Sequence, residues 1–425
     1  MNREMKHSGI AWIGEVPNVW TIDTIGNLYT QRNEKVSDKD YPPLSVGKMG
    51  VVPQLATAAK TDDGDNRKLV KVGDFAINSR SDRRGSCGIS SYDGSVSLIN
   101  TIITPRTEMN PQYYNWLFHT ELFADEFYKW GHGIVDDLWT TRWQEMKRIA
   151  IVVPPLAEQK AIADFLDKKC NEIDELVALQ EKMIEELKAY KQSVITEAVC
   201  KGLNPNVPMK DSGVEWVGNI PSDWQIHRVK RIVESFSKGE GITKEEVFND
   251  GDISCVRYGE IYGKYNNSFI DCISATKLAI QKSPRYFEKG DILCAGTGEL
   301  VEEIGKSIVY VGDDRCLAGG DIIIIKHKQN PIFLNYALNS RYAQAQKSCN
   351  KSKLKVVHIS ASDIGNVILI MPPLAEQQKI AEYLDEKCNG IDQLISIKQQ
   401  KIVELKDYKK SLIYEYTTGK KEVKL

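Results

Sequence analysis

The sequence predicts a mixed α/β protein with two globular domains and two long helices that pair with each other. Three observations support this fold class. A stretch beginning PPLAEQ at Pro154 returns, without a gap, at Pro372, 218 residues later. A box of the form S-G-x-x-W-x-G-x-x-P-x-x-W begins at Ser8 and again at Ser212. Between each box and the next PPLAEQ stretch, strand patterns alternate with helix patterns.

Each PPLAEQ stretch predicts the start of one long helix. Pro155 and Pro373 suit a first helical turn, where a missing N–H removes no helical hydrogen bond. Glu158 and Glu376 place negative charge near the positive end of the helix dipole. The first copy has no Pro or Gly over residues 156–199, so its helix should be roughly 65 Å long.

The apolar residues of both helices recur with the seven-residue spacing of a coiled coil. An apolar stripe of this length needs a partner, so we expect each helix to pack on the other, the alternative being two unrelated surface helices. The expected seam residues are Leu166, Ile173, Leu176, Met183, Leu187, Tyr190 and Val194 in the first helix, and Leu384, Ile391, Leu394, Leu405, Tyr408 and Leu412 in the second. Some positions of the predicted seam are polar, so the sequence does not fix the exact register of the coiled coil. These residues are Lys169, Gln180, Lys387, Lys398 and Lys401.

Each globular domain, or globe, is expected to begin at its tryptophan box and to end where a β-branched strand meets the double proline. An Asn-Pro pair at Asn110 and at Asn330 predicts one helix in each globe. The predicted domains are 1–153, the first globe; 154–203, the first long helix; 204–371, a linker and the second globe; and 372–425, the second long helix and a tail. The indoles expected to pack on apolar surfaces are Trp12, Trp20, Trp216 and Trp224.

Composition narrows the class of protein. A chain of 425 residues is too long for one core. A net charge of −2 differs from the usual basic footprint of a nucleic-acid-binding domain, so contacts with nucleic acid must come from local clusters or from partners. Nine Cys without a C-x-x-C pair indicate reduced thiols. The chain shows no leader pattern and no apolar run of membrane length, so we expect a cytoplasmic protein with no membrane partner.

No catalytic, metal or cofactor motif is present in the sequence. There is no phosphate-binding G-x-x-x-x-G-K-[ST], no G-x-G-x-x-G after a strand, no H-E-x-x-H and no G-x-S-x-G. The N-P-P-[YF] or D-P-P-Y tetrapeptide of amino-methyltransferases is also absent. We therefore expect no catalytic residue, no metal ligand and no cofactor in this chain.

Polar, Gly-rich loops in both globes provide the remaining chemistry. Arginine reads guanine through two hydrogen bonds and also binds phosphate. Solvated charged loops are the alternative, but such loops occur at roughly matching places in both globes. The candidate DNA-binding residues are Lys48, Gln54, Arg80, Arg83 and Arg84 in the first globe, and Arg257, Tyr258, Lys264, Lys306, Lys351 and Lys353 in the second.

With its duplicated PPLAEQ and tryptophan boxes, the chain resembles the specificity subunit of Type I restriction–modification systems. This resemblance covers essentially the whole chain and implies two target recognition domains, each reading one half of a split site in double-stranded DNA. It also implies that the two helices pair antiparallel and space the globes, so that the halves are related by a pseudo-two-fold axis.

The resemblance further implies partner subunits. Two modification subunits would bind S-adenosylmethionine and methylate adenine, and restriction or motor subunits would use ATP and Mg. The unchanged first turns of the long helices are candidate docking sites for the modification subunits: Glu158, Gln159, Glu376 and Gln377. Helix capping is an equally good explanation of these residues. The rival functions are a coiled-coil adaptor without DNA binding and a methyltransferase or nuclease whose site has no recognisable motif.

Overall fold

The protein is described from a computed structural model that covers residues 3–54, 63–133, 139–214, 217–349, 351 and 356–423. The chain divides into two compact units. The first contains Met1–Glu181 and Gln399–Leu425, and the second contains Lys182–Lys398. Each unit therefore joins one globe to a part of each long helix, α5 (Leu156–Lys201) and α10 (Leu374–Thr417). The mixed α/β class is confirmed.

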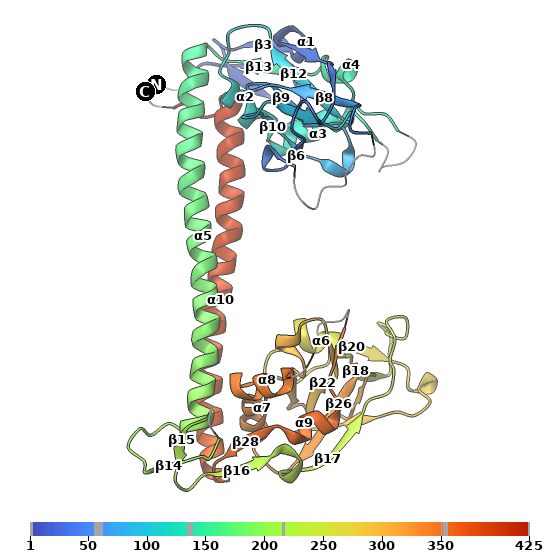
Figure 1. Cartoon of the computed structure of the whole chain (residues 1–425), viewed down its shortest axis with the longest axis vertical. Helices are drawn as coiled ribbons and strands as arrows, with labels where there is room; N and C mark the ends of the chain where they lie inside the picture. Colours follow the sequence, from blue (N-terminus) through green and yellow to red (C-terminus); the bar gives the residue numbers. More distant parts are fainter. Residues whose placement is uncertain are drawn as a thin grey trace. The chain divides into compact units, whose positions relative to one another are not determined.

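The globe of the first unit is built around a four-stranded antiparallel sheet in the order β10-β9-β12-β4 (Figure 1). A three-stranded sheet, β11-β8-β5, and the pairs β1-β2, β6-β7 and β13-β3 complete it. Its elements are β1 (Met5–His7), β2 (Glu15–Pro17), β3 (Thr21–Thr24), α1 (Ile25–Leu28), β4 (Tyr29–Arg32), β5 (Lys35–Val36), β6 (Leu44–Gly47), β7 (Gly50–Pro53), β8 (Arg67–Val70), β9 (Phe75–Asn78), η1 (Ser81–Arg83), β10 (Cys87–Ile89), β11 (Gly94–Val96), β12 (Asn100–Pro105), α2 (Pro111–Phe118), α3 (Glu121–Lys129), α4 (Trp143–Met146) and β13 (Ala150–Val153).

The globe of the second unit repeats this plan with additions. Its five-stranded sheet, β17-β26-β22-β24-β19, contains the counterpart of the first sheet, and a further sheet, β20-β18-β25-β21, lies beside it (Figure 1). Its elements are β14 (Met209–Asp211), β15 (Asn219–Pro221), β16 (Gln225–Arg228), η3 (Val229–Arg231), β17 (Val233–Lys238), β18 (Ile253–Val256), α6 (Tyr258–Gly263), β19 (Ser268–Phe269), β20 (Ser274–Thr276), η4 (Leu278–Ile280), β21 (Tyr286–Phe287), β22 (Ile292–Ala295), β23 (Thr297–Gly298), η5 (Val301–Glu303), β24 (Ser307–Tyr310), β25 (Cys316–Ala318), β26 (Ile322–His327), α7 (Pro331–Asn339), α8 (Arg341–Ser348), β27 (Val357–His358), α9 (Ala361–Asn366) and β28 (Ile368–Met371).

The helix predicted after each Asn-Pro pair is two helices. α2 ends at Phe118 and α3 begins after Thr120, whose hydroxyl accepts a hydrogen bond from the N–H of Phe123. Ser340 separates α7 from α8 in the same way. A hydroxyl that caps the next helix competes with helix continuation, and this explains both breaks.

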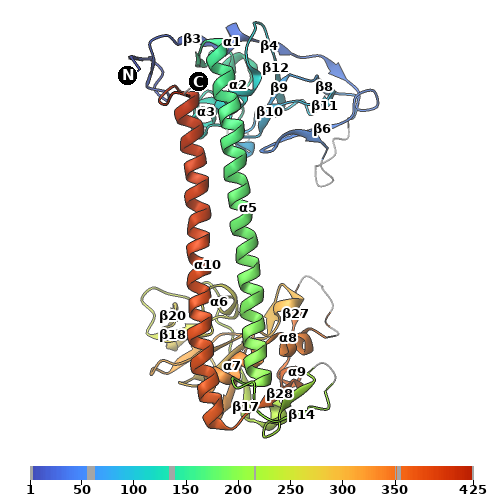
Figure 2. The same ribbon diagram turned by 90° about the vertical axis from the view of Figure 1, so that its left-hand side faces the viewer.

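Within each unit the two long helices run antiparallel (Figures 1 and 2). In the first unit Phe165 stacks on Tyr416, and Asp174 pairs with Lys409 at 2.6 Å. In the second unit Met183 contacts Lys398 and Lys191 pairs with Asp392 at 2.6 Å. Residue numbers rise along α5 while they fall along α10, so the prediction of an antiparallel pair is confirmed.

The buried seam corrects half of the predicted register. Leu166, Ile173, Leu384, Ile391 and Leu412 are buried as predicted. The other predicted set is shifted by one residue. The predicted seam residues that are exposed or only half-buried are Leu176, Met183, Tyr190, Leu394 and Tyr408. The residues that follow them in the sequence lie at the seam instead: Val177, Ile184, Lys191, Ile395 and Lys409. Residues three apart and residues four apart both lie on one face of a helix, so either set could form the seam. The predicted residues are as apolar as those that face the partner helix, so hydrophobicity did not distinguish the two sets.

Lysine at the seam is accommodated by cross-helix ion pairs. Lys191 and Lys409 occupy equivalent positions in the two copies, and their partners Asp392 and Asp174 are also equivalent. Partly exposed ion pairs contribute about 0–1 kcal/mol. Their geometry instead favours one register, because sliding either helix would leave a charged group beside apolar side chains.

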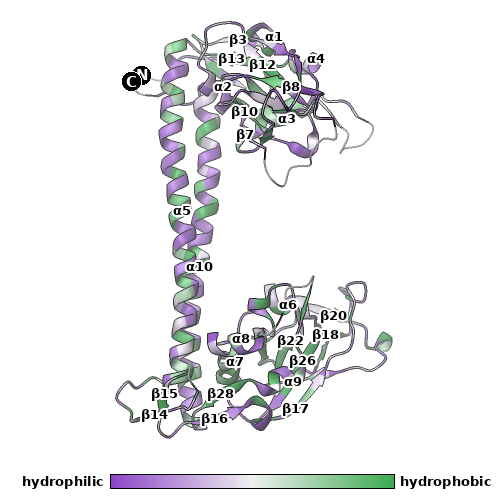
Figure 3. Cartoon of the chain, viewed as in Figure 1, coloured by the Kyte–Doolittle hydropathy of each residue, from purple (hydrophilic) through white to green (hydrophobic). Residues whose placement is uncertain are grey.

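The core of each unit includes residues from the ends of the long helices. In the first unit Ile162, Leu166 and Leu412 join a cluster with Trp20 and the aromatic side chains of α2 and α3. In the second, Ile195, Ile380 and other helix residues join Trp224 and the strands of the large sheet. Figure 3 shows the apolar character of these strands beside helices of mixed hydropathy. The globes therefore depend on the helices for their cores.

Leu166→Ala should destabilise the first unit far more than Leu176→Ala. Leu166 is fully buried, whereas Leu176 is 46% exposed on the same helix. Truncating a buried leucine costs about 2–5 kcal/mol, and an exposed one about 0.5 kcal/mol or less. Chemical denaturation of both variants measures the difference, and equal losses would contradict the register.

Candidate nucleic-acid interface

One hydrogen bond from a buried indole joins the tryptophan box to the long helix in each unit. The indole Nε1–H of Trp20 donates to Glu158 at 2.8 Å, and Trp224 donates to Glu376 at 2.8 Å. Both indoles are fully buried. Arg3 also pairs with Glu158. The second tryptophan of each box therefore packs as predicted; Trp12 is half-buried, and Trp216 lies outside the described residues.

The glutamine that follows each glutamate joins the helix to the Asn-Pro motif. Gln159 accepts a hydrogen bond from the backbone N–H of Asn110 at 2.9 Å, and Gln377 accepts one from Asn330 at 3.0 Å. Their amide groups donate to the carbonyls of Pro154 and Pro372. Both glutamine side chains are buried. Three motifs that are far apart in the sequence thus meet at one point in each unit.

A second duplicated bond joins the helix that follows the Asn-Pro pair of each globe to a long helix. Trp116 of α2 donates to Asp167 at 2.8 Å, and Tyr336 of α7 donates to Asp385 at 2.8 Å. Asp167 and Asp385 are equivalent positions of the repeat. Burial is the main cause of the raised pKa of Asp385.

These contacts bear on the four residues predicted to dock partners. Glu158, Gln159, Glu376 and Gln377 all bind groups of their own unit. Internal bonding therefore explains why this sequence is repeated. Partner docking through these four side chains stays a prediction.

The arginines predicted in the first globe lie together on the exposed loop between β9 and β10. Arg83 is 3.4 Å from Asp82, and Arg84 forms an ion pair with Asp125. The guanidinium of Arg80 has no hydrogen-bond partner among the described residues, and its backbone pairs with Thr140. All three side chains are exposed, so the loop presents positive charge to solvent.

Lys48 lies at the same end of the first globe as the arginine loop. It occupies the turn between β6 and β7, and β7 runs parallel to the end of β10 through a bridge between Val51 and Ser90. Gly88 allows this approach, because a Cβ at that position would lie 2.7 Å from the Cα of Gly50. Gln54 follows β7 at its other end and is half-buried. The structure therefore gathers Lys48 with the arginines and places Gln54 apart.

The equivalent loop of the second globe has the opposite charge. The sheet orders β10-β9-β12 and β24-β22-β26 correspond, so the loop between β22 and β24 matches the arginine loop. Its exposed charged residues are Glu299, Glu302 and Glu303. The two globes thus share a frame and differ in the chemistry that they present.

In the second globe Arg257 and Tyr258 lie at the start of α6, and Lys264 is exposed at its end. Lys306 donates to the carbonyl of Tyr262 at 3.0 Å, and burial lowers its pKa. Lys306 thus binds the last turn of α6 and is directed into the globe.

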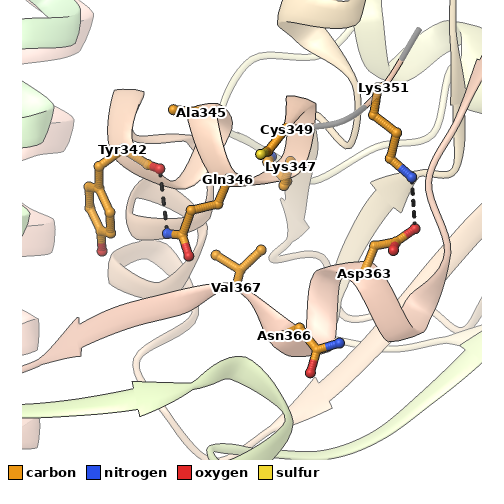
Figure 4. Close-up of a pocket in the computed structure, with 9 residues that line it drawn as sticks. All are labelled: Tyr342, Ala345, Gln346, Lys347, Cys349, Lys351, Asp363, Asn366 and Val367. Atoms are coloured by element: carbon orange, nitrogen blue, oxygen red, sulfur yellow. Dashed lines mark hydrogen bonds and ion pairs between the residues drawn. The ribbon is translucent and has the colours of Figure 1, made fainter. Parts of the chain in front are cut away.

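A cavity of about 630 Å³ lies beside α8 and α9 in the second globe (Figure 4). At its rim Lys351 pairs with Asp363 at 3.0 Å, which helps to lower the pKa of Asp363, although the backbone bond from Ser360 contributes more. Lys347 donates to the carbonyl of Gly305. Lys353, a predicted DNA contact, lies outside the described residues.

Sequence reasoning missed the tryptophan–glutamate bonds and the carboxylate of Glu260 beside Arg257. The tryptophan–glutamate bonds could have been inferred because the tryptophan box and the PPLAEQ stretch occur together in both halves of the sequence. The contact between Arg257 and Glu260 could have been inferred from the Arg-x-x-Glu spacing. Among the described residues no group of three or more His, Cys, Asp or Glu is placed to hold a metal ion. In that same part of the chain, every helix is too short or too polar to cross a membrane.

Comparison with known proteins shows which family of proteins this chain resembles. Residues 221–407 match the family model described as the Type I restriction modification DNA specificity domain. The MjaVIII specificity subunit of Methanocaldococcus jannaschii is 28% identical over 65% of this chain and 63% of its own length. The putative MjaX specificity subunit of the same organism is 24% identical over 97% of this chain and 96% of its own. The StySPI specificity subunit of Salmonella potsdam is 26% identical over 56% of this chain and 50% of its own.

Solved structures show the same fold. The HsdS subunit of Thermoanaerobacter tengcongensis aligns with a TM-score of 0.53 and 16% identity over 95% of this chain and 98% of its own. A chain from a structure concerned with assembly of the type I R-M system aligns with a TM-score of 0.71 and 14% identity over the same shares. Residues 221–407 thus match the DNA specificity domain of type I restriction systems, and the fold of the chain is that of the solved HsdS subunit.

Trp224→Phe should destabilise the protein more than Trp20→Phe. Each change removes the indole donor and leaves a partly buried carboxylate, at a cost of about 1–3 kcal/mol. Glu158 keeps Arg3 as a partner, whereas Glu376 keeps no other side-chain donor among the described residues. Thermal unfolding of both variants tests this order, and equal losses would show that Arg3 does not compensate.

Proposed function

We propose that the chain recognises a two-part site in double-stranded DNA, with one globe reading each part. The supporting observation is a duplicated frame that carries unlike loops. The tryptophan–glutamate and glutamine–asparagine bonds recur in both units, while the matching surface loops are basic in one and acidic in the other. Because the side chains that contact base edges determine sequence preference, two globes with the same fold and different loops should recognise two different half-sites.

In this proposal the chain has no catalytic residue and no cofactor. Methylation and cleavage belong to partner subunits, which would bind S-adenosylmethionine, ATP and Mg. The net charge of −2 is compatible with DNA binding if these partners supply part of the phosphate neutralisation. The candidate readers of the first half-site are Lys48, Arg80, Arg83 and Arg84, with Gln54 at the margin. For the second half-site we favour Arg257, Tyr258 and Lys264. Arg257 keeps further donors beside its bond to Glu260, whereas the amine of Lys306 is directed at the carbonyl of Tyr262 and that of Lys351 at Asp363.

Two modification subunits are proposed as the partners, one for each unit. Beside the seam, each unit exposes an apolar set that is also duplicated: Leu176, Leu179 and Tyr408 in the first, and Leu394, Ile397 and Tyr190 in the second. Each member is the repeat equivalent of a member of the other set. All lie on positions flanking the seam, where a further helix can pack. Two equivalent surfaces match two copies of one partner.

Exchanging residues 211–371 for the matching segment of another family member should change one half of the methylated site and leave the other half intact. Because each half-site is read by a separate globe, the unchanged first globe keeps its preference. Sequencing of methylated DNA produced by the assembled complex measures both halves. Changes in both halves of the site, or in neither half, would contradict the reading of each half-site by a separate globe.

Leu394→Asp together with Ile397→Asp should reduce bound modification subunits from two to one. Charge in a desolvated contact costs several kcal/mol and abolishes docking on that unit alone. Mass photometry of the purified complex measures the stoichiometry. Val403→Asp is the control, because Val403 is exposed but its repeat equivalent is Glu185. Retention of both partners by the double variant would place docking elsewhere.

A further inference from the structure

Glu260 is a buried carboxylate that makes four hydrogen bonds at the start of α6. It is 7% exposed. Its Oε1 accepts from Nε and Nη2 of Arg257 at 3.3 and 3.2 Å, and from the hydroxyl of Ser274 at 2.5 Å. Its Oε2 accepts from the backbone N–H of Arg257 at 3.0 Å. One carboxylate therefore holds both the backbone and the guanidinium of Arg257.

The surroundings make this arrangement rigid. Ser274 belongs to β20, which pairs with β18 through Cys255, two residues before Arg257. On the other side, Gly319 donates its N–H to the carbonyl of Val256 at 2.7 Å. A Cβ on Gly319 would lie 3.4 Å from the Cα and 3.5 Å from the Cγ of Arg257. The arginine stem therefore lies between a sheet-anchored carboxylate and the backbone after β25.

The bonds to Glu260 leave one edge of the guanidinium free. Nε and one hydrogen of Nη2 are used, so Nη1 and the second hydrogen of Nη2 remain as donors. The Arg257 side chain is 29% exposed. Two donors on one planar edge match the O6 and N7 acceptors of guanine.

The charge of the pair favours base reading over phosphate binding. Glu260 and Arg257 together carry no net charge, so Arg257 contributes little to phosphate neutralisation. Its hydrogen-bond donors remain directional, and Glu260 fixes their orientation before DNA arrives. A preorganised fork loses less conformational entropy on binding than a free arginine.

We infer that Glu260 is a positioning residue that orients Arg257 to read a guanine in the half-site recognised by the second globe. This inference rests on the proposed function, since it requires that the second globe reads DNA. Arg257 makes the base contact, and Glu260 acts only through it.

The first globe offers a matched control for a purely structural role. Arg142 and Glu145 form the same helix-start arrangement at α4, with the backbone N–H of Arg142 donating to Glu145 at 3.1 Å. In the described part of the chain the Arg142 guanidinium makes no bond to Glu145. Glu145→Gln therefore removes one negative charge and alters one helix start, as Glu260→Gln does, but it does not free an arginine guanidinium.

The test compares Glu260→Gln, Glu145→Gln and Arg257→Ala in the complex assembled with modification subunits. A pool of duplexes with randomised bases is bound, and the recovered sequences give the base preference at each position. Glu260→Gln should reduce the preference for guanine at one position of the second half-site by about tenfold. Binding to random duplex should stay equal or increase, with a salt dependence steeper by up to about one unit, because one negative charge is lost. Glu145→Gln should leave all positions unchanged.

Arg257→Ala separates this inference from the proposed function. If it relaxes one position and Glu260→Gln does not, Glu260 has no positioning role and recognition by the second globe stands. If it relaxes no position, Arg257 is not a reader and the inference fails, while the domain exchange still tests the function. Equal loss of binding to all sequences in Glu260→Gln, with a lower Tm, would also overturn the inference. Ser274→Ala provides a milder variant, since it keeps the carboxylate and should relax the same position by a smaller factor.

Discussion

The architecture depends on the hydrogen bond between a buried indole and the glutamate in the first turn of each long helix. A carboxylate in this position is favoured by the helix dipole, and its partial burial makes a hydrogen-bond donor valuable. Trp20 and Trp224 supply that donor from the beginning of each globe, while Gln159 and Gln377 reach the beginning of the first helix after the sheet. Three segments of each globe are thereby fixed relative to one helix end, and the loops between them can vary without disturbing these contacts.

Long-range periodicity allowed the sequence to predict most of the fold. The two long helices and the tryptophan boxes followed from repeats that a single chain displays, and the motifs in these repeats carried the resemblance to specificity subunits. The seam register was half wrong because Leu176 and Tyr190 are more apolar than Val177 and Lys191, which are the residues that face the partner helix. Lys191 is half-buried at the seam and pairs there with Asp392, and no local pattern reveals an aspartate from the other helix.

The candidate site was less predictable for the same reason. Arg83, Arg84 and Lys264 are exposed as a polar loop suggests, but Lys306 is directed at a carbonyl of α6 and Lys351 at Asp363. Which lysines remain available depends on tertiary partners that have no fixed spacing in the chain. Arg257 differs again, because its carboxylate partner is only three residues away. Local spacing could have indicated that pair, whereas the anchoring of Glu260 by Ser274 could not.

The reciprocal ion pairs across the long helices have an evolutionary consequence. Lys191 meets Asp392, and Lys409 meets Asp174; each pair joins the same two positions of the repeat in exchanged roles. Such reciprocity is the mark of an isologous contact between identical surfaces. An ancestral chain with one globe and one helix could have satisfied every one of these bonds by pairing with a second copy of itself. Gene duplication and fusion would then have freed the two globes to diverge, because fused copies no longer need identical surfaces to meet.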